Sequence, residues 1–353
     1  MIFKKQLVSI SKKIIQNIFK FFYGNINSVL QPNNEKDLKI KQTIIEGTNY
    51  KVFFCKNSRL YTDTIHDTAI IKNNSIVEGP SFQYRNNKNA SCVFNSVFNK
   101  GTPRFKKRIR GQVFSLLTGG GGNSNYWHWL FDVLPRLNII KNLINQTTLD
   151  YYLFPSLDKK FQRQTLDILN IPNEKRISSK SFRHFSAEEI VITSHPYTLL
   201  NDPSLDSLRI PLWISKYLRS EFLNSSIKKT KIKTFPKKIY INRKDATSLR
   251  YIINLDEVEN ILSKFGIESF TMSNLNFSDQ VAMFYNANEI IGLHGAGFAN
   301  IIFCKQKSKI IEMRSNTTGD VIKNLAINNN LNYYDISVKP KTINLNNQAG
   351  DIE

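Results

Sequence analysis

A histidine and an aspartate at helical spacing form the first group in this sequence that could perform acid–base chemistry. His128 and Asp132 are four residues apart within the run 125–136, so on a helix they share one face. The carboxylate could then orient the imidazole or raise its basicity, which suits a general base. The alternative is a structural contact beside the packed tryptophans of the same run.

A second group follows a buried-type strand at 289–293. The segment His294-Gly295-Ala296-Gly297 turns from this strand straight into a predicted helix. Glycines let a ligand approach the backbone, and the unpaired N–H groups at a helix N-terminus favour a phosphate. The imidazole of His294 could donate to a phosphate oxygen at the same edge. The alternative is a tight turn that needs its glycines only for packing.

Charged side chains stand at the ends of two further predicted strands. Arg243 follows the strand at 238–242, and Arg250 lies in the basic loop after it, where guanidinium groups could clamp a diphosphate. Glu312 lies at the end of the strand at 309–313 and could accept from ribose hydroxyls, by analogy with dinucleotide sites. A solvated basic loop and a strand-end salt bridge are the respective alternatives.

Runs of period two and of period 3.6 alternate through the C-terminal half and must position these groups. They predict strands at 238–242, 267–272, 289–293 and 309–313, and helices at 255–265, 278–286 and 296–303. Strands that alternate with helices of this length form a parallel, doubly wound sheet, whose ligands bind beyond the C-terminal ends of the strands.

The N-terminal half contains shorter predicted elements. Strands are expected at 50–55, 68–71, 91–98, 150–154 and 189–193, and helices at 126–142, 161–169 and 213–223. The polar run 25–41 is typical of a linker, and the Lys-rich run 225–236, closed by a proline, predicts a domain boundary. We therefore expect an N-terminal α/β domain at 42–224 and a C-terminal Rossmann-like domain at 237–340.

A basic amphipathic helix is predicted at 1–24. Its apolar side chains recur at steps of three and four, and lysines supply all of its charge. The apolar positions are Phe3, Leu7, Ile10, Ile14, Ile18, Phe21 and Phe22. Such a helix could lie on an anionic bilayer with its apolar face down. The alternatives are a terminal helix packed on its own domain and a frayed tail.

Composition restricts the class of protein and its partners. The chain has 353 residues, 41% of them hydrophobic, which is enough for a packed core in two domains. Its net charge of +21 indicates anionic partners. Three widely spaced cysteines exclude a disulfide framework and a Cys-x-x-Cys metal site, which fits a reducing cytoplasm. No run approaches the roughly 18 apolar residues of a membrane span.

The motifs also occur in a recognisable order along the chain. They are Asn125-x-x-His128-x-x-x-Asp132-x-x-Pro135-Arg136, Pro211-x-Trp213, Asn242-Arg243-Lys244-Asp245 with Arg250, Asn254 and Glu257, Gln280, His294-Gly295-Ala296-Gly297-x-x-Asn300, and Ile311-Glu312. This order resembles glycosyltransferase family 61 over roughly residues 110–340. Bacterial members are often capsular polysaccharide biosynthesis proteins. Where many members have Leu after His-Gly-Ala-Gly, this chain has Phe298.

The resemblance implies an α/β, GT-B-like architecture: two Rossmann-like domains facing a cleft, here with the N-terminal basic amphipathic helix in addition. It implies an inverting transfer of a sugar from a nucleotide sugar, with a UDP-sugar favoured, to a hydroxyl of a glycan or glycolipid acceptor. No other cofactor is expected. Because no Asp-x-Asp motif is present, no metal ligands are expected either. The protein is expected in the cytoplasm, with peripheral contact at the inner face of an anionic membrane.

The resemblance also assigns residues to the two sides of the reaction. Donor binding falls to Arg243, Arg250, His294, Gly295, Ala296, Gly297 and Glu312, and Asn125, Arg136 and Asn300 are expected elsewhere in the cleft. The base is His128 or Asp132: spacing within the family favours Asp132, whereas an ordinary imidazole pKa near ~6.5 favours His128.

Two other classes of protein compete with this interpretation. The net charge and the basic stretches 104–110 and 228–238 could indicate nucleic-acid binding, but no recognised nucleic-acid-binding motif accompanies them. We therefore expect no nucleic-acid partner. A non-catalytic scaffold of the same fold, which binds a nucleotide sugar without transferring it, is the second alternative.

Overall fold

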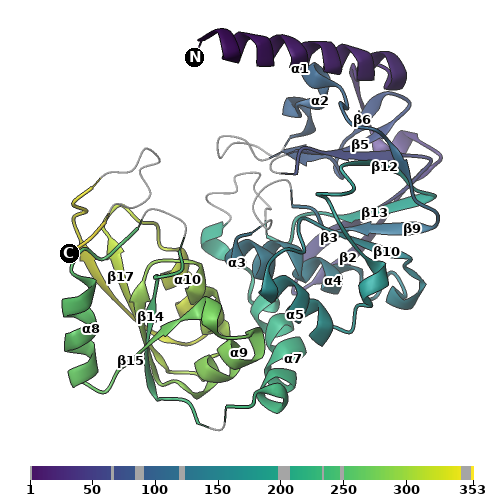
Figure 1. The fold of residues 1–353 in the computed structure, drawn as a ribbon. Helices are drawn as coiled ribbons and strands as arrows, with labels where there is room; N and C mark the ends of the chain where they lie inside the picture. The colour runs from purple at the N-terminus through teal and green to yellow at the C-terminus, as the bar shows by residue number, and fades with distance from the viewer. Residues whose placement is uncertain are drawn as a thin grey trace. The chain divides into compact units, whose positions relative to one another are not determined.

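The chain folds as two units in the computed structural model. The structure describes residues 2–64, 67–83, 91–118, 124–197, 207–232, 234–246, 250–342 and 351–353. Unit 1 comprises Met1–Lys159 and Ile171–Asp206, and unit 2 comprises Lys160–Asn170 and Ser207–Glu353. Each unit contains helices and a sheet with several parallel strands, so the chain is a mixed α/β protein (Figure 1).

A five-stranded parallel sheet organises unit 2. Its strands, in spatial order, are β15 (Glu268–Thr271), β14 (Lys238–Asn242), β16 (Glu289–Leu293), β17 (Lys309–Ser315) and β18 (Asn332–Val338). Numbered along the chain the order is 2-1-3-4-5, a common doubly wound arrangement. The parallel pairing confirms the prediction for 238–313. The edge strand β18 was not predicted, because its side chains are mostly exposed and form no buried apolar run.

Helices follow each of the first four strands of this sheet. They are α8 (Leu255–Lys264), α9 (Phe277–Asn286), the 3-10 helix η8 (Ala296–Phe303) and α10 (Val321–Asn328), and a 3-10 turn, η7 (Met272–Asn274), follows β15. The side chain of Asn276 caps α9 by accepting from the backbone N–H of Asp279 at 2.8 Å. The helices α8, α9 and η8 lie close to the bounds predicted from hydrophobic periodicity, whereas α10 was not predicted.

Two helices from earlier in the sequence also belong to unit 2. They are α5 (Lys160–Ile168) and α7 (Leu212–Lys229), and the turn η6 (Ser207–Arg209) precedes α7. Phe222 of α7 packs on Phe277 with ring centroids 5.0 Å apart, and Thr230 donates to Asp279 at 2.6 Å. The helix therefore continues into the predicted 225–236 boundary as far as Lys229, and this part of unit 2 begins earlier in the chain, at Ser207.

One of the two sheets around the unit 1 core is six-stranded and contains four consecutive parallel strands. Its spatial order is β11 (Arg176–Ser178), β10 (Tyr151–Phe154), β9 (Gln112–Ser115), β13 (Glu189–Thr193), β3 (Thr48–Lys56) and β2 (Leu38–Ile45). The first four strands are parallel, and numbered along the chain their order is 3-2-1-4, as in a Rossmann half. Strands β3 and β2 extend the sheet antiparallel.

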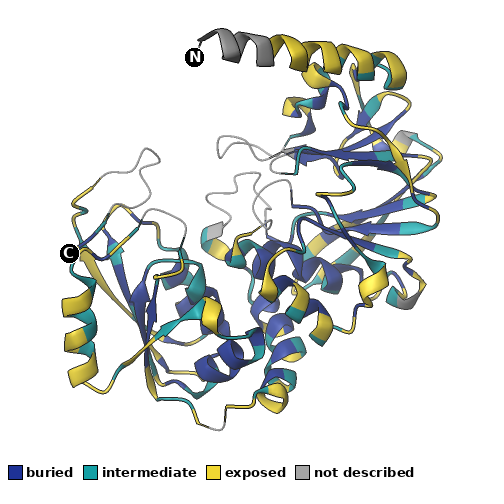
Figure 2. Cartoon of the chain, in the orientation of Figure 1, coloured by how far each residue is buried: buried dark blue, intermediate teal, exposed yellow. Residues whose placement is uncertain are grey.

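A second sheet packs on this one to enclose the core of unit 1. It contains β1 (Ser28–Leu30), β6 (Ser75–Val77), β5 (Asp67–Lys72), β4 (Arg59–Thr62), β12 (His184–Ser186) and β8 (Lys107–Arg108), with β7 (Phe82–Gln83) beside β5. Leu60, Ile70 and Phe185 of this sheet pack with Val113 and Ile190 of the other. The two layers are visible in Figure 1, and Figure 2 shows that most of their strands are buried.

Two predictions for the N-terminal half were wrong. The run 25–41 is not a linker, because β1 pairs with β6, a 3-10 turn follows at η1 (Pro32–Asn34), and β2 begins at Leu38. The run 91–98 is not a strand but two short helices, η2 (Cys92–Phe94) and α2 (Val97–Lys100). The carboxylate of Asp67 accepts from the backbone N–H of Ser96 at 3.1 Å, and such side-chain bonds compete with strand pairing.

The predicted helix at 126–142 contains a change of pitch. It consists of α3 (Tyr126–His128), a π turn, η3 (Trp129–Val133), and α4 (Pro135–Ile140). The N–H of Leu134 bonds to the carbonyl of Trp129 at 3.1 Å, five residues back. Pro135 has no N–H and its ring would clash with the carbonyl four residues before it, so the wider turn accommodates the proline. The predicted disturbance near Phe131 is thus present.

The N-terminal residues form a long helix, α1 (Ile2–Tyr23). Its C-terminal part contacts the rest of unit 1. The ring of Phe19 meets that of Phe105 edge-on with centroids 5.1 Å apart, and the ring of Tyr23 meets that of His184 with centroids 4.9 Å apart. No helix in the described residues is long and apolar enough to cross a membrane. The remaining short turns are η4 (Gln146–Thr148) and η5 (Asn173–Lys175).

The packing of α7 in unit 2 predicts a large cost for removing Phe222. Phe222→Ala should lower the free energy of unfolding by about 3–5 kcal/mol, because the ring is fully buried against Phe277. The control is Ile227→Ala on the same helix, at a side chain 39% exposed, which should cost about 1 kcal/mol or less. Denaturant unfolding followed by circular dichroism measures both. Equal effects would contradict the packing of α7 described above.

Candidate active site

The first candidate site lies where the strand order of unit 1 reverses. Strands β9 and β13 are neighbours, and the segments that follow their C-terminal ends supply the side chains of the site. After β9 the chain reaches α3 and η3, which carry His128 and Asp132. After β13 it reaches His195 and Tyr197. The two groups come together because parallel strands present their C-terminal ends at one edge.

The carboxylate of Asp132 is the centre of this cluster. One oxygen lies 2.8 Å from Nδ1 of His128 and 3.8 Å from Nε2 of His195. The other oxygen accepts from the hydroxyl of Tyr197 at 2.6 Å. Asp132 is buried, whereas the side chain of His128 is 36% exposed. The carboxylate therefore faces the protein, and the imidazole of His128 is more exposed than that of His195.

Hydrogen bonds fix the proton positions on the two imidazoles. Because Nδ1 of His128 faces a carboxylate, it carries the proton in the neutral ring, and Nε2 is left as the acceptor. Nδ1 of His195 instead accepts from the backbone N–H of Tyr197 at 3.3 Å, which places its proton on Nε2, toward Asp132. Of the two rings, His128 is the one that can take a proton from a bound molecule.

The pKa values of the cluster follow from burial and from the shared carboxylate. Burial lowers the pKa of His128, but the charge and hydrogen bond of Asp132 outweigh it and leave that pKa above its ordinary value. Burial raises the pKa of Asp132, yet His128 and His195 together hold it far below its ordinary value. Burial dominates at His195 and lowers its pKa. Asp132 is thus a carboxylate, and His195 is a neutral donor.

Arg136 and Asn125 form hydrogen bonds that support this cluster. Arg136 is fully buried, and it donates to the carbonyl of Asp132 and to the carbonyl of Thr193, each at 3.0 Å. It thereby ties the helix that carries Asp132 to the end of β13. Asn125 accepts from the N–H of Trp127 at 2.9 Å and caps α3. The guanidinium of Arg136 thus lies in the core of unit 1, and the expected role of this residue in a cleft stays a prediction.

The second candidate site lies at the corresponding reversal in unit 2, between β14 and β16. Arg243 directly follows β14, and Arg250 follows in the same connection to α8. Each donates from Nη1 to the carbonyl of His294, at 3.2 Å and 3.4 Å respectively. The structure therefore brings together two arginines and the His-Gly-Ala-Gly turn, as the strand-end argument predicts.

The glycines of this turn make room for specific neighbours. A Cβ on Gly295 would lie 1.9 Å from Nη1 of Arg243, so any side chain there displaces the guanidinium. A Cβ on Gly297 would lie 3.2 Å from the side chain of Ile241. Gly297 and Ala296 open the helix η8. The lack of a side chain at Gly295 thus leaves room for the guanidinium of Arg243, and the lack of one at Gly297 allows close packing against β14.

Glu312 is fully buried and both its oxygens are engaged. One bonds to Nδ1 of His294, and the other accepts from the hydroxyl of Tyr333 at 2.5 Å. The carboxylate is thus engaged within unit 2, and its expected contact with ribose hydroxyls stays a prediction. Burial lowers the pKa of His294, and Arg250 and Arg243 lower it further, against the opposing effect of Glu312. The neutral ring thus presents Nε2 as an acceptor, and donation to a phosphate requires its charged form.

Asn300 also lies in the core of unit 2. It is fully buried and donates to the side chain of Gln280 at 3.0 Å, and Gln280 donates to the carbonyl of Met272 at 2.9 Å. The pair joins η8 to α9. Tertiary hydrogen bonds hold Asn300 inside unit 2, as they hold Arg136 inside unit 1, and the expected role of Asn300 in a cleft stays a prediction.

Comparison with known proteins decides the class. The family model described as Glycosyltransferase 61 matches residues 126–311. The chain belongs to the glycosyltransferase 61 family. This confirms the resemblance found in the order of motifs. The match includes His128 and Asp132 of the first site and Arg243 and His294 of the second. Comparison with curated proteins finds no match. Membership of this glycosyltransferase family implies a nucleotide-sugar donor and an acceptor.

The described residues contain no group of three or more His, Cys, Asp or Glu side chains arranged to hold a metal ion. Cys55, Cys92 and Cys304 are each free and buried. The cations that the structure places beside the His-Gly-Ala-Gly turn are the guanidinium groups of Arg243 and Arg250.

Sequence reasoning missed His195, Tyr197 and Tyr333. His195 and Tyr197 follow the C-terminal end of the strand at 189–193, so the strand-end rule applied to Arg243 also marks them. Tyr333 lies on β18, which gave no strand signal, and nothing in the sequence ties it to Glu312.

The contact between His128 and Asp132 predicts a measurable titration. The pKa of His128 should lie above its ordinary value of about 6.5. In Asp132→Asn it should fall below that value, because the variant loses the negative charge that stabilises the imidazolium and keeps the burial that opposes it. NMR titration of the imidazoles measures both values, with His294 as the control ring that should not respond. An unchanged pKa in Asp132→Asn would contradict the contact.

Proposed function

We propose that this protein is an inverting glycosyltransferase. It moves a sugar from a nucleotide sugar, with a UDP-sugar favoured, to a hydroxyl of a glycan or glycolipid in surface polysaccharide synthesis. Membership of the family supports the transferase class. The proposal adds the GT-B type of architecture, with the acceptor side in unit 1 and the donor side in unit 2.

The observation that carries the proposed mechanism is the contact between His128 and Asp132. Both residues were candidates for the base. Both oxygens of Asp132 have partners inside the protein, whereas Nε2 of His128 has no hydrogen-bond partner in the described part of the chain. This supports His128 as the base and Asp132 as the residue that orients it and stabilises its charged form.

In the proposed step the sugar moves from the diphosphate to the acceptor oxygen. The acceptor oxygen bonds to the anomeric carbon while its proton moves to Nε2 of His128. The bond between the anomeric carbon and the diphosphate oxygen breaks, and the nucleoside diphosphate leaves with that electron pair. A single displacement inverts the anomeric configuration. A raised pKa makes His128 a stronger proton acceptor, provided that it is neutral when the acceptor binds.

The leaving diphosphate is assigned to the arginines of unit 2. Arg243 and Arg250 converge on the turn that opens η8, and both guanidinium groups keep their charge at neutral pH. Fixed cations aimed at the group on which charge develops stabilise the transition state more than the ground state. This supports donor binding at the switch point between β14 and β16.

The proposal extends to the place of action. α1 carries lysines and no acidic residue, and its exposed isoleucines and phenylalanines suit the surface of an anionic membrane. We propose peripheral contact at the cytoplasmic face, where a lipid-linked acceptor would be presented.

Replacement of the base should affect turnover and spare donor binding. His128→Asn should lower kcat by ~10²–10⁴, because general-base catalysis acts on the transition state. Asp132→Asn should lower kcat and move the acidic limb of the rate profile to lower pH, since the pKa of His128 falls. Transfer assays and donor titration calorimetry measure the two effects. Near-native turnover in both variants would exclude this pair, and donor binding without transfer or hydrolysis by the unmodified protein would favour a scaffold.

Donor affinity should depend on Arg243 and not on its neighbour. Arg243→Ala should weaken nucleoside diphosphate binding by about 1.5–3 kcal/mol, the range for a hydrogen bond to a charged group. Lys244→Ala is the matched control, because Lys244 is exposed and already paired with Glu259 at 2.7 Å. Titration calorimetry with UDP compares them. If the two variants bind UDP equally, Arg243 is not part of the donor site.

A further inference from the structure

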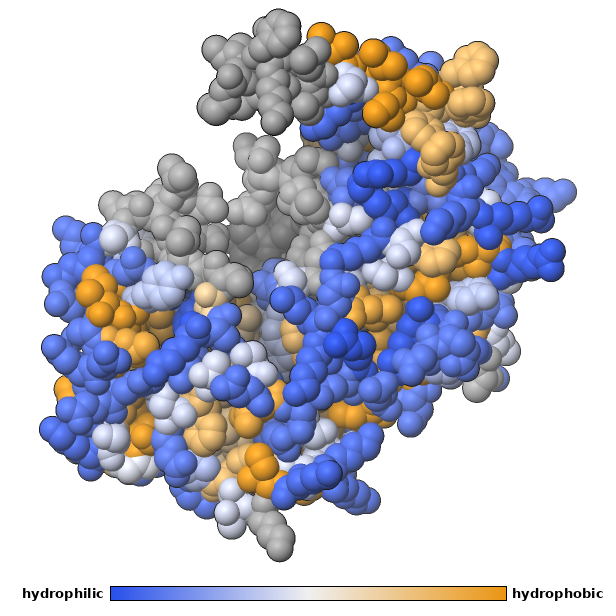
Figure 3. Space-filling view, viewed as in Figure 1, coloured by the Kyte–Doolittle hydropathy of each residue, from blue (hydrophilic) through white to orange (hydrophobic). Residues whose placement is uncertain are grey.

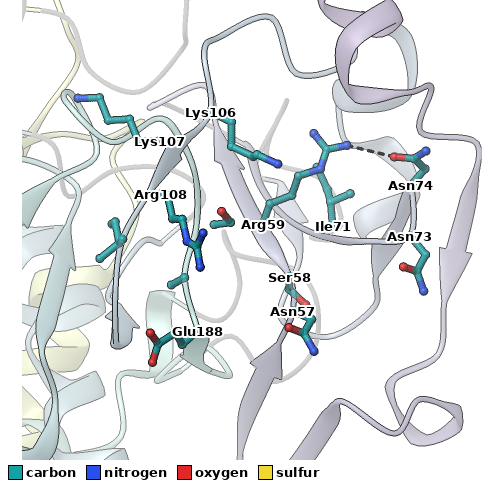
Figure 4. Close-up of a pocket in the computed structure, with 13 residues that line it drawn as sticks. Asn57, Ser58, Arg59, Ile71, Asn73, Asn74, Lys106, Lys107, Arg108 and Glu188 are labelled. Carbon is teal, nitrogen blue, oxygen red and sulfur yellow. Dashed lines mark hydrogen bonds between the residues drawn. The ribbon is translucent and has the colours of Figure 1, made fainter.

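Unit 1 contains a basic pocket that shares no residue with the Asp132 cluster. Its volume is about 590 Å³, within the usual range for small-ligand sites. Arg59, Lys106, Lys107 and Arg108 line it, and Glu188 is the acidic residue of its wall. The walls come from the start of β4, from β8 and from the connection between β12 and β13 (Figure 4).

The cations of this pocket are not neutralised by the protein. No carboxylate lies within ion-pair distance of Arg59, Lys106 or Arg108 in the described ranges of the chain. Arg59 donates to neutral groups instead, including the hydroxyl of Thr102 and the carbonyl of Tyr23, both at 2.9 Å. Figure 4 shows the ammonium of Lys106 directed toward Arg59, whereas Lys107 points away. Like charges turned toward one another favour an anion beside them.

Helix α1 is joined to this pocket through its last residue. The ring of Tyr23 lies under both cations, 5.8 Å from the guanidinium carbon of Arg59 and 5.7 Å from Nζ of Lys106. The hydroxyl of Tyr23 also accepts from the backbone N–H of Lys106 at 3.0 Å. The end of α1 therefore contacts two of the basic residues that line the pocket, although Tyr23 does not line it itself.

The rest of α1 presents an apolar surface that the protein does not cover. Phe21 is 86% exposed and Phe22 67% exposed, and Ile10, Ile14 and Ile18 are each about half exposed. Phe105, adjacent to the pocket residue Lys106, is 82% exposed and touches Phe19 of the helix. Hydrophobic side chains gather over α1 in Figure 3. An uncovered apolar helix with lysines as its only charges suits the headgroup region of an anionic bilayer.

We infer that the pocket binds the phosphate headgroup of a membrane amphiphile while α1 lies in the membrane interface. Arg59, Lys106 and Arg108 would surround the phosphate, and the exposed aromatic side chains of α1 and Phe105 would contact the acyl boundary. A free anion would need only the pocket, whereas the continuity of the pocket with α1 favours a phosphate attached to a lipid. The inference rests on the membrane contact in the proposed function and adds a specific headgroup site to it.

The test compares vesicle binding by two charge-matched double variants. Lys106→Gln/Arg108→Gln removes two exposed cations of the pocket, and Lys228→Gln/Lys229→Gln removes two exposed cations from the end of α7. Sedimentation is measured with phosphatidylcholine vesicles that contain phosphatidic acid, and with phosphatidylserine vesicles of equal surface charge. The pocket variant should lose about 10- to 30-fold in partitioning onto phosphatidic acid and less onto phosphatidylserine, since each basic residue near an anionic surface contributes to binding. Equal losses in the two variants would overturn the inference.

Further arms separate a failure of this inference from a failure of the proposed membrane contact. If a variant that lacks residues 1–24 binds anionic vesicles as well as the full chain, the membrane role of α1 is wrong. The pocket is then tested with soluble dihexanoyl phosphatidic acid by thermal shift on the full chain. A stabilisation that is lost in Lys106→Gln/Arg108→Gln supports the headgroup site. No stabilisation, or an equal one from inorganic phosphate at the same concentration, overturns it.

Discussion

Parallel strands end at a common edge, and this constraint positions the side chains of both candidate sites. In unit 1 the edge is formed by β9 and β13, and in unit 2 by β14 and β16, the pair of strands at which the order reverses in each sheet. The segments that follow these strands carry the side chains of the two sites. Residues that are distant in sequence therefore lie in contact. Asp132 and Tyr197 do so in unit 1, and Arg243 and His294 do so in unit 2.

Each of the two sites contains a buried carboxylate that bonds to an imidazole and to a phenol. Asp132 bonds to His128 and Tyr197, and Glu312 bonds to His294 and Tyr333. Burial of a carboxylate is costly unless its oxygens have partners, and each group satisfies that requirement. The surroundings then separate the two histidines: the pKa of His128 is raised because its carboxylate dominates, whereas burial and two arginines lower the pKa of His294. The surroundings of His128 thus suit proton uptake, whereas those of His294 hold a neutral imidazole beside two arginines.

The sequence predicts best those elements whose signal is local. Strands β14 and β16 are short, buried apolar runs bounded by charged residues and glycines, and their predicted bounds match the structure. The exposed edge strands β1 and β18 show no such pattern. They are strands because they pair with β6 and β17, and the local sequence does not reveal that pairing. The same limit applies to side chains. Arg136 and Asn300 are of types that commonly face ligands, but partners far along the chain, Thr193 and Gln280, bury both. His195 was missed because its partner Asp132 lies 63 positions earlier in the sequence.

The space above Gly295 has a consequence for how this family can change. The guanidinium of Arg243 occupies the position where a Cβ at residue 295 would stand. A side chain at 295 would therefore move the flexible end of this arginine away from the carbonyl of His294. The effect of a substitution at either position thus depends on the residue at the other.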